Sequence, residues 1–178
     1  MNGKKNTISS EKKFENNWWS YWIDNYIMPN GKKGEYHYVH TGGSTFIVPL
    51  IDEEHVLMLK QFRYLTDRVS LEFPGGGIKE GQDPKEIARK ELIEEIKYDA
   101  ELEYAGSFNP YIGVTTEFCH VFIARNLRES VEFPQDDSEE FEVVKLSLQE
   151  VEEKVISNEI FNGMSLAIWA LVRSKLLK

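Results

Sequence analysis

Three glutamates near the middle of the chain are the residues whose type and spacing best suit chemistry. Glu91, Glu94 and Glu95 are spaced i, i+3 and i+4, so a helix would present all three side chains on one face. Carboxylates this close repel one another by roughly a few tenths of a kcal/mol per pair on a solvated helix. A hard divalent cation would remove this repulsion, because Mg²⁺ takes oxygen ligands. The spacing therefore predicts a metal-binding helix face, and a solvated acidic surface is the alternative.

The residues that lead into these glutamates carry the signals of a helix start. Asp83 suits the N-cap, Pro84 suits the first helical position, and Glu86 completes a capping box. The glycines 75–77 come just before, where a backbone can approach a phosphate or offer carbonyl oxygens to a metal. Four apolar residues fall on a different arc from the glutamates and predict a core-facing side: Ala88, Leu92, Ile93 and Ile96.

Strands and helices that would position this helix follow from the apolar patterns on either side of it. The predicted strands span residues 46–50, 55–64, 69–73, 101–108, 117–124 and 141–147. Ser147 and Glu150 form a second capping box for a helix that ends near Ile156, and a final amphipathic helix is expected from Gly163 to Leu177. Strands on both sides of a central helix, followed by further helices, predict an α+β fold with sheet packed between helices.

The first 40 residues have a different character. Residues 1–13 are polar and lysine-rich, and we expect a disordered arm there. Residues 14–40 combine an aromatic segment with a predicted hairpin, in which the turn PNGKKG joins WIDNYIM to EYHYVH. The tryptophans Trp18, Trp19 and Trp22 either pack locally under the hairpin or form an exposed platform for a ligand or a second subunit.

Composition excludes several classes of protein. With 178 residues, 41% of them hydrophobic and 29% charged, the chain suits one ordinary globular domain. The net charge of −9 argues against nucleic-acid binding, which needs a basic face. Because no apolar run approaches the roughly 20 residues of a membrane span, we expect no membrane partner. The one cysteine, Cys119, excludes an internal disulfide and suits a reducing compartment, so we expect the cytoplasm.

The segment from Gly76 to Tyr98 resembles the signature of the Nudix hydrolases. That signature is G-x5-E-x7-R-E-U-x-E-E-x-G-U, where U is a bulky apolar residue, and its acidic core is present here as Glu-Leu-Ile-Glu-Glu at 91–95. Three positions depart from it: Gln82 stands in place of Glu, Lys90 in place of Arg, and Lys97 in place of Gly. The resemblance implies a Nudix fold.

In that fold a mixed β-sheet is sandwiched between helices. We assign the Nudix domain to residues 41–178 and treat the hairpin as an N-terminal extension. Further motifs resemble the ADP-ribose and ADP-sugar pyrophosphatase branch of the family: QFRY at 61–64, LEFPGG at 71–76, GSFNP at 106–110 and DDSEEFEVV at 136–144.

This branch implies Mg-dependent hydrolysis of the diphosphate linkage of a nucleoside diphosphate sugar such as ADP-ribose. The products would be a nucleoside monophosphate and a sugar phosphate. The branch also implies a homodimer, because its N-terminal part pairs two subunits. Where it usually carries Ser-Pro-Gly, this chain has Tyr111-Ile112-Gly113, which leaves the exact substrate open.

The resemblance also implies roles for individual residues. The metal, Mg²⁺ or alternatively Mn²⁺, would be held by Glu91, Glu95 and the carbonyl of Gly75, with Glu94 as a further ligand or the general base. The branch takes its base from the acidic loop, where Asp137 and Glu139 match; a solvated turn is the alternative for this loop. The candidate substrate-binding residues are Arg63, which could pair with a phosphate, Glu72, Gly76 and Trp22.

Two other functions stay open. A catalytically weak Nudix-fold binding module is compatible with Gln82 and Lys90, because this pair lacks both the ion pair and the guanidinium fork that would brace the metal helix. The three mutually repelling glutamates argue against it, since a binding module has no need of them. A hydrolase acting on another nucleoside diphosphate derivative is the second alternative.

Overall fold

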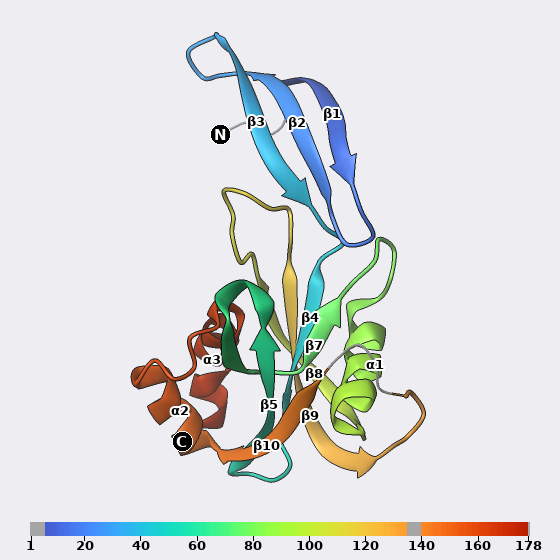
Figure 1. The fold of residues 1–178 in the computed structure, drawn as a ribbon, viewed down its shortest axis with the longest axis vertical. Helices are drawn as coiled ribbons and strands as arrows, with labels where there is room; N and C mark the ends of the chain where they lie inside the picture. The colour runs from blue at the N-terminus through green and yellow to red at the C-terminus, as the bar shows by residue number, and fades with distance from the viewer. Residues whose placement is uncertain (1–5, 135–139, 178) are drawn as a thin grey trace.

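The computed structural model describes residues 6–134 and 140–177, which form three β-sheets and three α-helices (Figure 1). In chain order the strands are β1 (Thr7–Glu15), β2 (Ser20–Ile27), β3 (Lys33–His40), β4 (Ser44–Pro49), β5 (His55–Arg63), β6 (Arg68–Glu72), β7 (Gly75–Gly77), β8 (Tyr98–Phe108), β9 (Cys119–Glu129) and β10 (Phe141–Ser147). They pair in the orders β1-β2-β3, β7-β4-β9-β8 and β10-β5-β6. The four-stranded sheet is mixed, because β4 runs parallel to β9 and antiparallel to β7.

The helices cover both sides of the two central sheets. They are α1 (Pro84–Ile96), α2 (Leu148–Ile156) and α3 (Gly163–Leu176). Figure 1 shows α1 on one flank of the strands and α2 with α3 on the other. The predicted α+β arrangement, with sheet between helices, is confirmed. No helix in the described part of the chain is long and apolar enough to cross a membrane.

Alternating side chains in the central strands feed two separate cores. In β4, Ile47 packs in the core on the α1 side, and its neighbour Val48 packs in the core on the α2 and α3 side. This alternation is what a strand buried on both faces requires. The α1-side core consists of Ile47, Leu57, Leu59, Ala88, Leu92, Ile96, Phe122 and Ala124. Helix α1 is therefore held against the sheet by the apolar arc that its sequence predicts.

Both ends of α1 are fixed by local chemistry. The side chain of Asp83 accepts hydrogen bonds from the backbone N–H groups of Lys85 at 2.7 Å and Glu86 at 3.2 Å, and Pro84 occupies the first turn. The helix ends at Lys97, which adopts a left-handed conformation with φ of 63°. Glycine adopts this conformation more easily than lysine, so the C-terminus of α1 carries some local strain.

The N-terminal sheet corrects one expectation. Residues 7–13, predicted to be disordered, belong to the edge strand β1, which pairs with β2 from Thr7↔Tyr26 to Glu15↔Ser20. The predicted hairpin forms from β2 and β3, so the extension has three strands and stands apart from the central sheets (Figure 1). Nearly every side chain of β1 is exposed. The backbone pairing with β2 orders this polar segment. The composition of residues 7–13 gives no sign of this pairing, because the partner strand lies further along the chain.

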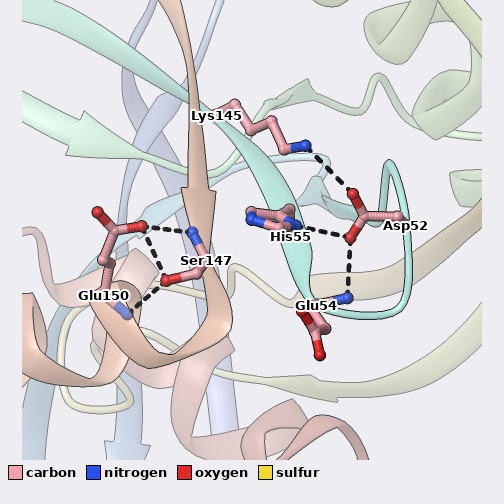
Figure 2. A network of polar contacts seen from close by, with 6 residues as sticks. All are labelled: Asp52, Glu54, His55, Lys145, Ser147 and Glu150. Carbon is pink, nitrogen blue, oxygen red and sulfur yellow. Dashed lines mark hydrogen bonds and ion pairs between the residues drawn. The ribbon is translucent and has the colours of Figure 1, made fainter.

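A polar network ties the β4–β5 turn to β10, at the end of the domain remote from the N-terminal sheet (Figure 2). Asp52 accepts from the N–H of Glu54 at 2.9 Å and lies 2.8 Å from Nδ1 of His55 and 3.2 Å from Nζ of Lys145. The N–H of Glu54, followed by the ring of His55, holds the pKa of Asp52 well below its usual range. Beside it, Ser147 and Glu150 form the predicted capping box of α2 (Figure 2).

Candidate functional site

The glycine strand β7 and the acidic face of α1 lie directly against each other. The N–H of Gly75 donates to Oε2 of Glu95 at 2.8 Å, and Glu95 is only 8% exposed. Gly76 lies under Glu91, because a Cβ at Gly76 would be 2.5 Å from the Glu91 carboxyl carbon. A buried carboxylate needs hydrogen-bond donors, and the glycine strand supplies one. The acidic face is therefore not a solvated surface.

Positions 75 and 76 require glycine, because neighbouring atoms come too close to leave room for a side chain. A Cβ at Gly75 would lie 2.2 Å from the backbone oxygen of Thr45, in the neighbouring strand β4. By contrast, a Cβ at Gly77 would meet no atom within 4 Å. The first glycine thus allows the β4–β7 pairing, and the second allows Glu91 to reach the backbone.

Glu94 is held differently from its two neighbours. Its Oε2 accepts from Nζ of Lys90 at 2.8 Å, one helical turn earlier, and its backbone oxygen accepts from Nζ of Lys97 at 2.9 Å. Gln82 lies in the turn before α1, where its side-chain oxygen accepts from the N–H of Lys79 at 2.8 Å. The side chains at the three positions that depart from the Nudix signature thus make local hydrogen bonds in and next to α1.

The donor atoms at this place fit a hard divalent cation. Glu91 and Glu95 supply carboxylate oxygens beside a glycine strand in which a side chain at position 76 would fill the space next to Glu91. Mg²⁺ is commonly bound by one or two protein carboxylates, with waters and substrate phosphates completing its shell. Among residues 6–134 and 140–177, no three acidic, histidine or cysteine side chains are already arranged around one metal position. Glu94 would have to leave Lys90 to become a third ligand.

A cavity of about 470 Å³ adjoins the glycine strand. One wall comes from the β1–β2 connection, including Trp18 and Trp19, and another comes from Gly77 and the residues that follow it. The remaining polar lining residues are Glu15, Asn16, Asn17, Ser20, His40, Thr41, Ser44, Lys79, Glu80 and Glu117. The cavity therefore offers exposed indole rings and hydrogen-bonding groups at the Gly77 end of the glycine strand, and the three glutamates of α1 are not among its described lining residues.

Trp22 lies elsewhere. Its indole N–H donates to Oγ of Ser20 at 2.8 Å, and Nζ of Lys12 lies 5.9 Å from its ring centroid. The structure does not include Trp22 in the lining of this cavity, where Trp18 and Trp19 stand instead. The density of tryptophans pointed to the right segment, but Trp18 and Trp19 lie in the β1–β2 connection whereas Trp22 lies within β2.

Arg63 and Glu72 form a bidentate ion pair. Nε of Arg63 donates to Oε1 of Glu72 at 2.8 Å, and Nη2 donates to Oε2 at 2.5 Å. The Glu72 side chain is 7% exposed and that of Arg63 is 50% exposed. Burial raises the pKa of Glu72, but its hydrogen bonds, led by those from Arg63, together with the charge of Arg63 outweigh burial, so the net pKa lies below the ordinary value. Glu72 thus orients the guanidinium of a side chain that is half exposed.

A second cavity of about 410 Å³ lies between the N-terminal sheet and the loop after β8. Tyr26, Tyr36 and Tyr38 line it, together with the buried Asp24, to which the Tyr38 hydroxyl donates at 3.2 Å. Tyr36 also donates to the backbone oxygen of Gly113 at 3.0 Å and so links the sheet to the loop.

The structure also bears on the predicted general bases and on two further residues near the larger cavity. Asp137 and Glu139, the predicted general bases, lie outside the described residues. Glu117, by contrast, lines the larger cavity and accepts a hydrogen bond from Ser44. Beside this pair, Cys119 is buried, and burial raises the pKa of its thiol to about 12, so it is no nucleophile.

Comparison with known proteins shows the family of the chain. The NUDIX domain model matches residues 41–162, which is more than half of the chain. An ADP-ribose pyrophosphatase of Bacillus subtilis (strain 168) is 30% identical over 162 residues, covering 90% of this chain and 88% of the relative. A methanol dehydrogenase activator of Bacillus methanolicus is 26% identical over 162 residues, covering 90% of this chain and 88% of that relative.

The fold is found among solved structures as well. A crystal structure of an ADP compounds hydrolase superimposes with a TM-score of 0.81 at 20% identity, covering 96% of this chain and 92% of the other. The match of the fold, the family model and the glutamates of α1 packed on the glycine strand leads to one conclusion: the chain belongs to the Nudix family of hydrolases.

Proposed function

We propose that this protein hydrolyses the diphosphate linkage of a nucleoside diphosphate sugar of the ADP-ribose type, with Mg²⁺ as its metal. The products are a nucleoside monophosphate and a sugar phosphate. The observation that carries the proposal is the apposition of Glu91 and Glu95 to Gly75 and Gly76. A cavity lined by indole rings begins at the next residue of the strand, Gly77. The 30% identity to a protein named ADP-ribose pyrophosphatase supports this substrate class.

Each part of the site has a task in this reaction. Glu91 and Glu95 hold the metal, with the backbone of Gly75 as a further oxygen source. When bound, the ion neutralises charge on the diphosphate oxygens and makes a water molecule more acidic. Arg63, oriented by Glu72, presents its exposed side to a phosphate. Trp18 and Trp19 offer ring faces to the base, since base–aromatic stacking is worth about 1–3 kcal/mol.

The reaction also needs a general base that takes a proton from the attacking water. Asp137 and Glu139 are the proposed bases by their resemblance to the acidic loop of the branch, and Glu94 is the alternative on the helix. Substituting each residue by its amide separates these roles. The base is the residue whose amide variant loses kcat while its affinity for Mn²⁺ stays unchanged.

The decisive experiment is incubation with Mg²⁺ and a panel of nucleoside diphosphate sugars, followed by measurement of nucleoside monophosphate. We expect release from ADP-ribose or a close analogue, and loss of release in Glu95→Gln. Binding of the same compounds without any release would contradict the enzymatic proposal and favour the binding module. Release from dinucleotides alone would move the substrate to another nucleoside diphosphate derivative.

The same proposal includes a homodimer in the cytoplasm. β1 is an exposed edge strand of the N-terminal sheet, which makes that sheet suited to contact with a second copy. Light scattering coupled to size exclusion would measure the mass, and a monomer at micromolar concentration would contradict the dimer. The free thiol of Cys119 suits a reducing compartment.

A further inference from the structure

Two of the three departures from the Nudix signature converge on one residue. Lys90 and Lys97 both donate to Glu94: the first to its carboxylate at 2.8 Å and the second to its backbone oxygen at 2.9 Å. Glu91 and Glu95, by contrast, lie against the glycine strand. The acidic set is therefore divided into two carboxylates beside the glycines and one carboxylate beside an ammonium group.

We propose that Lys90 competes with the divalent metal for the carboxylate of Glu94. The inference rests on the proposed function in one respect, namely that the metal binds at Glu91 and Glu95. An ammonium and a divalent cation seek the same carboxylate oxygens, so a metal that takes Glu94 must displace Lys90. Lys90 thereby sets how readily the metal gains Glu94 as its third carboxylate ligand.

The geometry of the pair makes such displacement easy. Lysine precedes glutamate at i and i+4, which is the less favourable order on a helix. The Lys90 side chain is 45% exposed, so its ammonium can turn into solvent, whereas the Glu94 side chain is 20% exposed and stays at the site. An arginine could hold the carboxylate with a planar two-pronged fork, but lysine offers a compact charge on a flexible stem.

Lys97 provides a matched control. It carries the same charge, lies at the end of the same helix and contacts the same residue, but it donates to the backbone oxygen of Glu94. Removing the charge of Lys97 therefore measures how much Mn²⁺ binding tightens when any nearby positive charge is lost. Only the excess effect of Lys90 over Lys97 reports competition for the carboxylate.

The test is a titration of the purified full-length protein with Mn²⁺, in which free Mn²⁺ is measured by electron paramagnetic resonance. Lys90→Met should bind Mn²⁺ about two- to fivefold more tightly than wild type, because exposed ion pairs are worth up to about that factor. Lys97→Met should change the affinity less. Lys90→Arg should bind Mn²⁺ with the wild-type affinity or more weakly.

A double-mutant cycle decides whether the effect passes through Glu94. In the Glu94→Gln background, Lys90→Met should tighten Mn²⁺ binding no more than Lys97→Met does. An undiminished gain in that background, or equal gains from the two lysine variants, would overturn the proposal. Thermal unfolding of every variant should stay close to wild type, since an exposed ion pair on a helix contributes little.

Failure of this proposal is distinguishable from failure of the proposed function. The Mn²⁺ titration needs no substrate, so the coupling between Lys90 and Glu94 can be present in a protein that releases no nucleoside monophosphate. Conversely, full hydrolysis with no coupling in the cycle leaves the enzymatic function standing and removes Lys90 from metal control.

Discussion

Gly76→Ala should disable the site while leaving the fold intact. A Cβ at this position would lie 2.5 Å from Cδ and Oε1 of Glu91. Carbon atoms need about 3.5 Å between them, so the carboxylate must move by roughly 1 Å. The atoms in conflict are the far end of a flexible side chain, so we expect Glu91 to move and strand β7 to stay in place.

The expected effect on activity is large, whereas the effect on stability is small. Misplacing a catalytic group by about 1 Å can lower the rate by about 100-fold. That factor corresponds to about 2.7 kcal/mol of transition-state stabilisation. Overpacking a rigid core costs about 1–3 kcal/mol. Because Glu91 relieves the contact, the free energy of unfolding should fall by less than about 1 kcal/mol.

The adjacent glycines supply the controls. Gly77→Ala places its methyl group in open space and should keep stability and kcat, with any change confined to KM because Gly77 lines the cavity. Gly75→Ala places it 2.2 Å from the backbone oxygen of Thr45, which cannot move without disturbing β4, and should lower the melting temperature. The assay is kcat/KM for ADP-ribose with Mg²⁺, alongside thermal unfolding followed by circular dichroism.

Two results would refute this reasoning. Wild-type kcat/KM in Gly76→Ala would mean that the position of Glu91 does not matter to the reaction. A further large loss on adding Gly76→Ala to Glu91→Ala would mean that the methyl group acts through another residue.

The remaining predictions concern the metal helix, the indole rings and the buried ion pair. Glu95→Gln should lower kcat by about 1,000-fold or more with the fold retained, measured by product release and circular dichroism; unchanged turnover would remove Glu95 from the site. Trp19→Ala should raise KM for ADP-ribose about tenfold, whereas Trp22→Ala should not; equal effects would place the base elsewhere. The pKa of Glu72 is lowered from 4.5, so its stabilising contribution is present above that pH and is lost as pH falls through the lower folded value. Chemical denaturation across this acidic range should show a weaker pH dependence in Arg63→Met, and an unchanged dependence would contradict the coupling.

Local structure followed from the sequence because its causes are local. The cap at Asp83, the apolar arc of α1 and the capping box of α2 each involve residues within about one helical turn, and all three are found where the pattern predicts them. The central strands were recognisable from their apolar side chains. Their alternation between two cores follows from the pleat once both faces are covered. The Nudix assignment rested on spacing along one helix and is confirmed.

The site itself depended on contacts between distant segments, which only the tertiary structure decides. Residues 7–13 are polar and suggested disorder, but pairing with β2 makes them a strand. The β1–β2 connection brings Trp18 and Trp19 to the cavity, whereas Trp22, within strand β2, contacts Ser20 and Lys12.

The three glutamates show the same division most clearly. Their shared helix face was fixed by the spacing along α1, because helical periodicity is a local property. The surroundings of each glutamate differ, however. Glu95 is buried against Gly75, Glu91 lies over Gly76 and Glu94 pairs with Lys90. These differences follow from where β7 packs against the helix and from the conformations open to each side chain. The sequence thus determined that this face is acidic, and the packing of strand against helix decided how each carboxylate is held.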